Sequence, residues 1–144
     1  MALVVGTNSW CTISEADTHL TDRLGAANWF LLSDSGDPGT ESKTSLLITS
    51  FYLLFNNVLF DIAISSSDEN VKHAQIEFAL FLLENRIDYF KRMQMQASGI
   101  EQFTRSEWSE KLKEIGIPVN ILGMLTEYGV GNTVVTLLSP YDTD

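Results

Sequence analysis

Two glutamate–histidine pairs are the first residues in this sequence whose types and spacing could do chemistry. Glu15 precedes His19 by four positions, and Glu69 precedes His73 by the same interval. A carboxylate-bridged di-iron centre in a helical bundle uses Glu-x-x-His, a three-residue spacing, on inward helix faces. That spacing occurs nowhere in the sequence. We therefore interpret both pairs as exposed neighbours on helices, and we expect no metal centre and no cofactor.

A series of three carboxylates is the next candidate. Glu77 and Glu84 are seven residues apart on one helical face, and Asp88 follows four residues later. A general acid–base pair would need one of these carboxyl groups in an apolar pocket that shifts its pKa. We interpret the series as a solvated acidic edge of a helix.

Nucleophile and phosphate-binding motifs are absent from the sequence. It contains no Gly-x-Ser-x-Gly, no Walker sequence and no glycine fingerprint after a strand. The single cysteine, Cys11, rules out an internal disulfide and is expected to be a buried, inert thiol. We predict that the protein is not an enzyme.

The charge balance limits the partners of the chain. Nineteen acidic residues stand against nine basic ones, a formal net charge of −10. Such a protein does not grip phosphate backbones over its whole surface. The one candidate nucleic-acid patch contains Arg86, Lys91 and Arg92, but Asp88 lies four residues before Arg92 and partly neutralises it. We interpret this patch as a solvated helix end.

The longest periodic stretch, residues 68–95, predicts the helix around which the chain is organised. Two apolar stripes run side by side along it, so its apolar face is wide. Neither Gly nor Pro interrupts the run, and at about 1.5 Å per residue the helix would be roughly 40 Å long. Covering two faces requires at least two neighbours, and we expect some of them to belong to other subunits.

A short first helix is predicted over residues 14–25. Ser14 is a suitable N-cap with Asp17 three positions later, and Gly25 suits the left-handed position that ends a helix. Residues 33–42 are rich in turn formers and predict a surface loop. The buried side of the first helix is expected to consist of Ala16, Leu20 and Leu24.

The second long helix is predicted over residues 41–59. It is apolar on nearly every side, which is typical of a helix buried all round. Polar residues interrupt it and it is short, so we do not expect it to span a membrane. The core of the bundle is predicted to contain Phe51, Leu54, Ile76, Ala79, Leu80 and Leu83.

The remainder of the chain predicts two shorter helices and an extended tail. The helices should cover residues 104–116 and 118–128, the second beginning at Pro118. Residues 129–144 are β-prone, and a lone strand needs a partner, either residues 2–5 or another protein chain. We therefore divide the chain into a helical domain, residues 1–128, and an assembly tail. The predicted interface residues of the tail are Val134, Val135, Leu137, Leu138 and Tyr141.

The N-terminal sequence also bears on localisation. MALVVGTNSW has neither a positively charged region nor a long apolar core, so we do not expect a signal peptide. The fold class that emerges is all-α: a small bundle of three main helices, followed by short helices and the extended tail. We expect the protein to be made in the cytoplasm.

The order of these parts resembles that of a known family. Residues 9–17, Ser-Trp-Cys-Thr-Ile-Ser-Glu-Ala-Asp, are similar to the Ser-Tyr-x-Thr-x-x-Glu-Ala-Asp start of head–tail adaptor proteins of tailed bacteriophages, also called head-completion or connector proteins. Gly25, Ala27-Asn28-Trp29, residues 47–50 and the pattern from Val71 to Ala79 extend the resemblance to about residues 6–95. The family's Trp-x-Gly and Trp-Pro segment is missing, because residues 60–70 read FDIAISSSDEN.

The resemblance implies a structural virion protein at the head–tail interface. Such adaptors form a ring, commonly of twelve copies, beneath the portal protein, extend the DNA channel and dock tail, stopper or tail-terminator proteins. They have no catalytic site. Duplex DNA would pass without tight binding, and Glu77, Glu84 and Asp88 would be the acidic residues that face the channel. Two alternatives stay open: a single-stranded-DNA-binding accessory protein, and a soluble helical oligomer that acts as a regulator.

Overall fold

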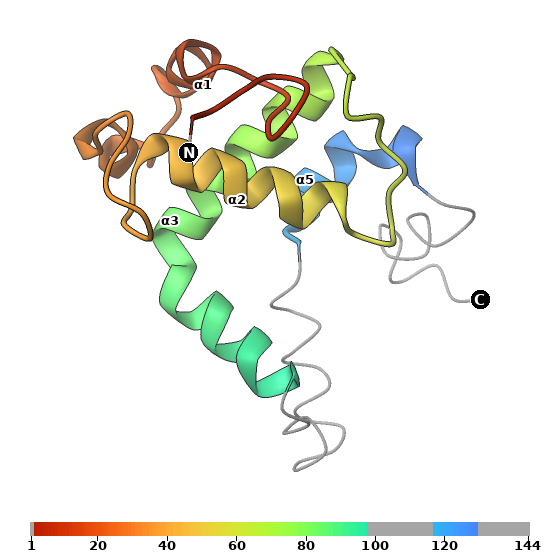
Figure 1. Cartoon of the computed structure of the whole chain (residues 1–144). Coiled ribbons are helices and arrows are strands. Elements are labelled where there is room, and N and C mark those ends of the chain that lie inside the picture. The colour runs from red at the N-terminus through yellow and green to blue at the C-terminus, as the bar shows by residue number, and fades with distance from the viewer. Residues whose placement is uncertain (1, 98–116, 130–144) are drawn as a thin grey trace.

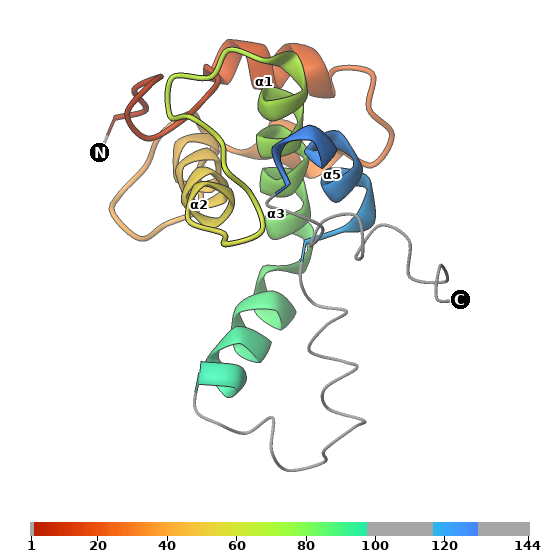
Figure 2. The same ribbon diagram turned by 90° about the vertical axis from the view of Figure 1, so that its right-hand side faces the viewer.

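The computed structural model describes residues 2–97 and 117–129, and helices are the regular secondary structure of this part. Two long helices, α2 (Lys43–Phe55) and α3 (Glu69–Ala97), cross in Figure 1. Figure 2 shows the first half of α3 at the centre, with α2 on one side and α5 (Val119–Met124) on the other. The short helix α1 (Ile13–Leu20) lies across the upper end of α3. The predicted all-α bundle with three main helices is confirmed for the described residues.

Helix α2 begins at a reciprocal cap. The Ser42 hydroxyl accepts a hydrogen bond from the Ser45 backbone N–H, and the Ser45 hydroxyl accepts one from the Ser42 N–H. The helix ends at Phe55, four residues earlier than predicted, where Asn56 leaves the helical conformation. Its buried apolar residues are Leu46, Leu47, Phe51 and Leu54, whereas Tyr52 is 42% exposed, so the helix is not covered on every side as predicted.

Helix α3 supplies much of the core and carries a kink that the sequence did not reveal. The six predicted core residues in α2 and α3 are all buried, which confirms the predicted packing face. At Asn85 the backbone leaves helical geometry (φ −126°, ψ 15°), and the Asn85 side-chain amide donates to the carbonyl of Phe81. A side chain that takes an i−4 carbonyl competes with the backbone ladder. The helix predicted over residues 68–95 is therefore present as α3, but it is kinked, and its second half turns away from the body (Figures 1 and 2).

Helix α1 is shorter than predicted and uses a different cap. Its N-cap is Thr12, paired with Glu15 in a capping box, and not Ser14 with Asp17. The longer Glu15 side chain reaches back to the Thr12 N–H at 2.8 Å. The helix ends at Leu20, and Gly25 has the expected left-handed conformation (φ 90°) in the turn that follows. Ala16 and Leu20 are buried as expected, but Leu24 lies beyond the helix and is 91% exposed, so that part of the prediction was wrong.

The C-terminal part of the described chain packs back onto the bundle. Helix α5 follows Pro118, and a single 3₁₀ turn, η3 (Thr126–Tyr128), completes the region predicted to be helical. The Asp61 N–H donates to the Tyr128 carbonyl, and Gly129 forms an isolated antiparallel bridge with Phe60. The predicted helix at 104–116 lies outside the described residues, as do the five predicted interface residues of the tail. A 3₁₀ turn, η1 (Ala27–Leu31), joins α1 to the loop before α2.

No helix in the described ranges is both long enough and apolar enough to cross a membrane.

Candidate functional site

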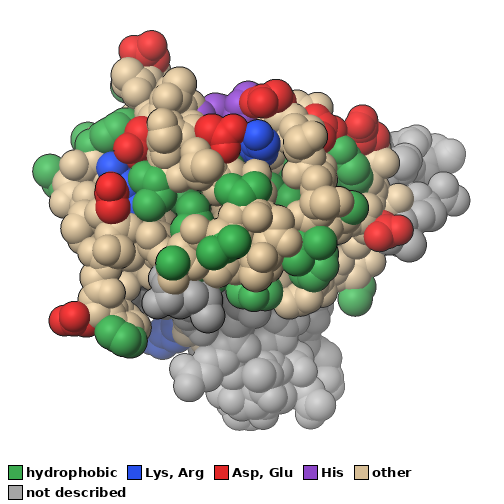
Figure 3. Space-filling model, turned by 45° about the horizontal axis from the view of Figure 1, so that its top comes forward, with side chains coloured by type: hydrophobic (Ala, Val, Ile, Leu, Met, Phe, Trp, Pro, Cys, Tyr) green, Lys and Arg blue, Asp and Glu red, His purple; other side chains and the backbone are tan. Residues whose placement is uncertain are grey.

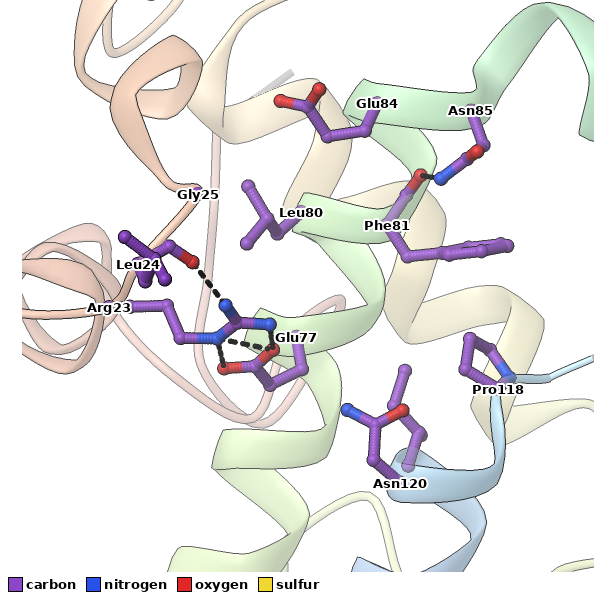
Figure 4. A pocket seen from close by; sticks show the side chains of 11 residues that line it. Arg23, Leu24, Gly25, Glu77, Leu80, Phe81, Glu84, Asn85, Pro118 and Asn120 are labelled. Atoms are coloured by element: carbon purple, nitrogen blue, oxygen red, sulfur yellow. Dashed lines mark hydrogen bonds and ion pairs between the residues drawn. The ribbon is translucent and has the colours of Figure 1, made fainter.

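A buried carboxylate on α3, that of Glu77, is bound by two side chains from the N-terminal part of the chain. Glu77 is 5% exposed. Its Oε1 accepts from Arg23 Nη2 at 3.0 Å, and its Oε2 lies 2.9 Å from His19 Nε2. Arg23 Nε lies 3.0–3.2 Å from both carboxylate oxygens, as Figure 4 shows. The interpretation of Glu77 as a solvated, channel-facing residue was therefore wrong, because its charge is paired inside the protein.

Opposing effects set the protonation state of Glu77. Burial raises the pKa of the carboxyl group, but the hydrogen bonds and charges of Arg23 and His19 together outweigh burial and hold it below the usual value of 4.5. The same hydrogen bond from Arg23 to Glu77 raises the pKa of the Arg23 guanidinium. Glu77 therefore stays ionised near neutral pH. It is an anchor for the α1–η1 turn and not a proton donor.

The glutamate–histidine pairs divide between two arrangements. Glu69 and His73 are neighbours one helical turn apart, with 3.4 Å between Glu69 Oε1 and His73 Nε2, as predicted. Glu15 does not pair with His19, because it accepts from Lys72 Nζ at 2.7 Å, which is the largest cause of its lowered pKa. The ring of His19 instead stacks on that of His73 at 4.3 Å. The described residues contain no cluster of three or more His, Cys, Asp or Glu that could hold a metal ion.

A third group of charged contacts is centred on Lys43, the first residue of α2. Its ammonium group is 3.0 Å from Asp17 and 3.8 Å from Asp34, and it also lies over the rings of Trp29 and Phe30. Asp17 in turn accepts from the indole N–H of Trp29 at 2.9 Å. This cluster fastens the loop before α2 to α1 and η1.

These ion pairs include every Lys and Arg among the first 85 residues. Arg23, Lys43 and Lys72 are the Lys and Arg residues of this segment, and each is bound to a carboxylate. Figure 3 shows acidic side chains scattered over one face of this part of the protein, with few basic ones among them. The same 85 positions contain eleven acidic residues: Glu15, Asp17, Asp22, Asp34, Asp37, Glu41, Asp61, Asp68, Glu69, Glu77 and Glu84. The folded body therefore carries a net negative charge.

The other sequence-predicted charged sites remain separate from this network. Glu84 is exposed, as predicted, and one of its oxygens accepts from Asn28 at 3.1 Å. Lys91 is also exposed. The side chains of Asp88, Arg86 and Arg92 lie outside the described part of the structure.

The residues that carry the family resemblance form a framework around a buried amide that the sequence analysis missed. Gln75 is fully buried, and its Oε1 accepts from the Trp10 backbone N–H at 2.9 Å. Its Nε2 donates to the Ser9 hydroxyl at 2.8 Å and to the Leu47 carbonyl at 2.9 Å. Trp10 packs edge-on against Phe51. The sequence contained one indication of this buried amide: Gln75 lies between two apolar residues on the wide apolar face of the helix.

A small pocket lies beside the Glu77–Arg23 pair. Its volume is about 230 Å³, and three elements enclose it: the turn at residues 23–25, α3 and the beginning of α5 (Figure 4). Apolar side chains of Leu80, Phe81, Pro118 and Ile121 form much of its lining. Three polar side chains, Glu84, Asn85 and Asn120, also line it, next to the Glu77–Arg23 pair.

No protein-family model, curated protein or solved structure matches this chain.

Proposed function

We propose that this protein is a structural component of a tailed-bacteriophage virion, a head–tail adaptor that forms a ring beneath the portal. Copies of the chain would build the ring, twelve of them as is common for such adaptors. The ring would extend the DNA channel and dock a tail, stopper or tail-terminator protein. The protein would act without a catalytic site, and its place would be the neck of the virion.

One observation carries this proposal: the folded body has no unpaired Lys or Arg in its first 85 residues. All three cations there are bound to carboxylates, while exposed acidic residues such as Asp22, Asp37 and Asp61 remain at the surface. Nucleic-acid binding draws its affinity from cations that neutralise phosphates. Because these cations are already paired, this part of the surface offers DNA no free Lys or Arg, so DNA could slide past it, as an adaptor channel requires. The exposed Lys91 lies beyond this part, on the second half of α3.

The framework around Gln75 and Lys43 supports the same proposal. Residues of the resembling segment, among them Ser9, Trp10, Asp17 and Trp29, make specific buried or partly buried contacts. The resemblance therefore falls on residues that determine how the N-terminal part folds. A small helical bundle with this N-terminal framework is the architecture that the resemblance implies.

Imaging of the protein with its portal tests the proposal. The purified chain is mixed with portal rings encoded by the same genome and examined by negative-stain electron microscopy. We expect an additional ring of density on one end of the portal. A chain that leaves the portal bare would contradict the adaptor function and favour the regulator.

A salt series with DNA tests the remaining alternative. At an ionic strength of about 0.15 M, where the screening length is about 8 Å, we expect no gel shift of duplex or single-stranded DNA. Sub-micromolar binding of single strands with a steep salt dependence would favour the single-stranded-DNA-binding protein instead.

A further inference from the structure

The pocket beside Glu77 and Arg23 has the size of a single side chain. Its volume of about 230 Å³ is below the range of roughly 300–1,000 Å³ that is typical of small-molecule and cofactor sites. Leu80 and Ile121 form a buried apolar floor. Such a pocket suits the aliphatic stem of one long residue better than a free metabolite.

The charges around the pocket favour a cation. Arg23 and Glu77 neutralise each other, and the remaining guanidinium nitrogen of Arg23 donates to the Leu24 carbonyl. Glu84 has no basic partner among the described residues; it accepts only from the neutral amide of Asn28. An anion would meet Glu84 and a negatively charged body, so a positively charged group is the complementary ligand.

The rim of the pocket indicates that this cation belongs to a protein. Leu24, on one wall, is 91% exposed. Val119 is 70% exposed and lies between Pro118 and Asn120, which line the opposite wall. A protein partner could cover this exposed apolar surface and remove it from water, whereas a free cation would leave it exposed.

We propose that this pocket receives an arginine side chain of a protein partner. Arginine is enriched in protein interfaces, where lysine is depleted, and its planar guanidinium can bind a carboxylate through two N–H groups. The stem would lie on Leu80 and Ile121, and the guanidinium would donate to Glu84. Asn120 lies across the pocket from Glu77 and Arg23 in Figure 4, with its amide nitrogen on the Glu77 side.

The assignment does not depend on the proposed function. If Glu84 lies in a protein interface, other exposed carboxylates would form the acidic wall of a DNA channel. A portal that docks normally onto a Glu84→Gln variant would leave the adaptor function intact, whereas the pocket is tested separately with small probes.

Nuclear magnetic resonance titration with two isosteric probes is the first experiment. N-acetyl-arginine amide carries the guanidinium, and N-acetyl-citrulline amide has the same shape without the charge. We expect the arginine probe to shift the signals of Leu24, Asn28 and Asn120 with a dissociation constant on the order of 1 mM. The citrulline probe should leave them unchanged. Equal shifts with both probes, or no shift with either, would overturn the proposal.

Two variants with the same charge change sharpen the test. Glu84→Gln should weaken binding of the arginine probe by about three- to tenfold, the range for one partly exposed charged contact. Asp37→Asn removes one exposed carboxylate in the loop before α2 and should have no effect. Equal weakening by both variants would mean that general charge attracts the probe, which contradicts a specific pocket.

A short peptide with arginine between two leucines tests whether the occupant is a protein. The leucines should contact Leu24 and Val119, so the peptide should bind more tightly than the single-residue probe. Val119→Ser should reduce that gain and leave the affinity of the single-residue probe unchanged, because Val119 does not line the pocket. A peptide no better than the amino-acid derivative would count against a protein partner. The native chain could also self-associate, and Glu84→Gln could abolish that self-association. This result would show that a second copy of the chain occupies the pocket, and it would contradict a partner of different sequence.

Discussion

Replacing Glu77 with glutamine should destabilise the protein in a way that depends on pH. The change keeps the shape of the side chain and removes the negative charge of the carboxylate, which is bound by both Arg23 and His19. A hydrogen bond to a charged group contributes about 1.5–3 kcal/mol, and breaking a fully buried ion pair costs about 3–5 kcal/mol. The Arg23 side chain is 41% exposed, so water can solvate it again after the substitution. We therefore expect a loss near the lower range, about 2 kcal/mol.

The pH dependence follows from the lowered pKa of Glu77. In the unfolded chain this carboxyl group titrates near 4.5, and in the folded protein it titrates lower. Its contribution to the free energy of unfolding is therefore complete above about pH 4.5 and is lost as the pH falls through the folded pKa. The stability difference between the native protein and Glu77→Gln should be constant near neutral pH and should shrink in acid.

Urea unfolding followed by circular dichroism, from about pH 7 to about pH 3, measures both quantities. Glu84→Gln is the matched control on the same helix, because its carboxylate is exposed, and it should change stability by less than about 0.5 kcal/mol. Arg23→Met should cost more than Glu77→Gln, since it leaves the buried carboxylate without its guanidinium partner and with only the hydrogen bond to the His19 ring. A loss for Glu77→Gln that equals the control, or that stays the same in acid, would refute the reasoning.

Three further changes test the framework and the core. Gln75→Leu leaves the buried Trp10 N–H without its Gln75 acceptor and should cost about 1–3 kcal/mol in urea unfolding; a cost below about 1 kcal/mol would contradict the role of this amide. Leu80→Ala and Leu83→Ala should each cost about 2–5 kcal/mol in thermal melts, and small losses in both would contradict the packing of α3. Burial raises the pKa of Cys11 to about 12, so iodoacetamide should label the unfolded chain and spare the folded one; equal labelling rates would show that the thiol is accessible.

The sequence predicted the helical packing well because apolar periodicity reports burial directly. The stripes in residues 68–95 predict core positions such as Ile76 and Leu83, and both side chains are buried. The kink at Asn85 could not be found in this way, because it depends on a side-chain amide that binds the Phe81 carbonyl. Periodicity does not fix the caps either, since Thr12 and Ser14 each offer a suitable hydroxyl with an acidic residue three positions later.

The candidate site was harder to predict because its partners are distant in the chain. Glu77 and Arg23 are 54 residues apart, and no spacing rule joins them. A partial signal existed: Glu77 lies three residues from Ala74 and from Leu80, both on the apolar face of α3. An acidic residue at the margin of such a face needs a partner, but the sequence alone does not say which of the basic residues provides it.

The contacts of the N-terminal segment show that the family resemblance concerns the structure of this segment more directly than its partners. Asp17 binds both Trp29 and Lys43, and Thr12 with Glu15 caps α1, so these residues stabilise the N-terminal part of the fold. A similar segment in another protein therefore indicates a similar N-terminal structure, and it does not identify a surface for the proposed partners. Leu24 lies between α1 and η1, is almost fully exposed and contributes nothing to the core. Substitution of Asp17 should thus impair folding and docking together, whereas substitution of Leu24 should impair docking alone if that surface binds a partner.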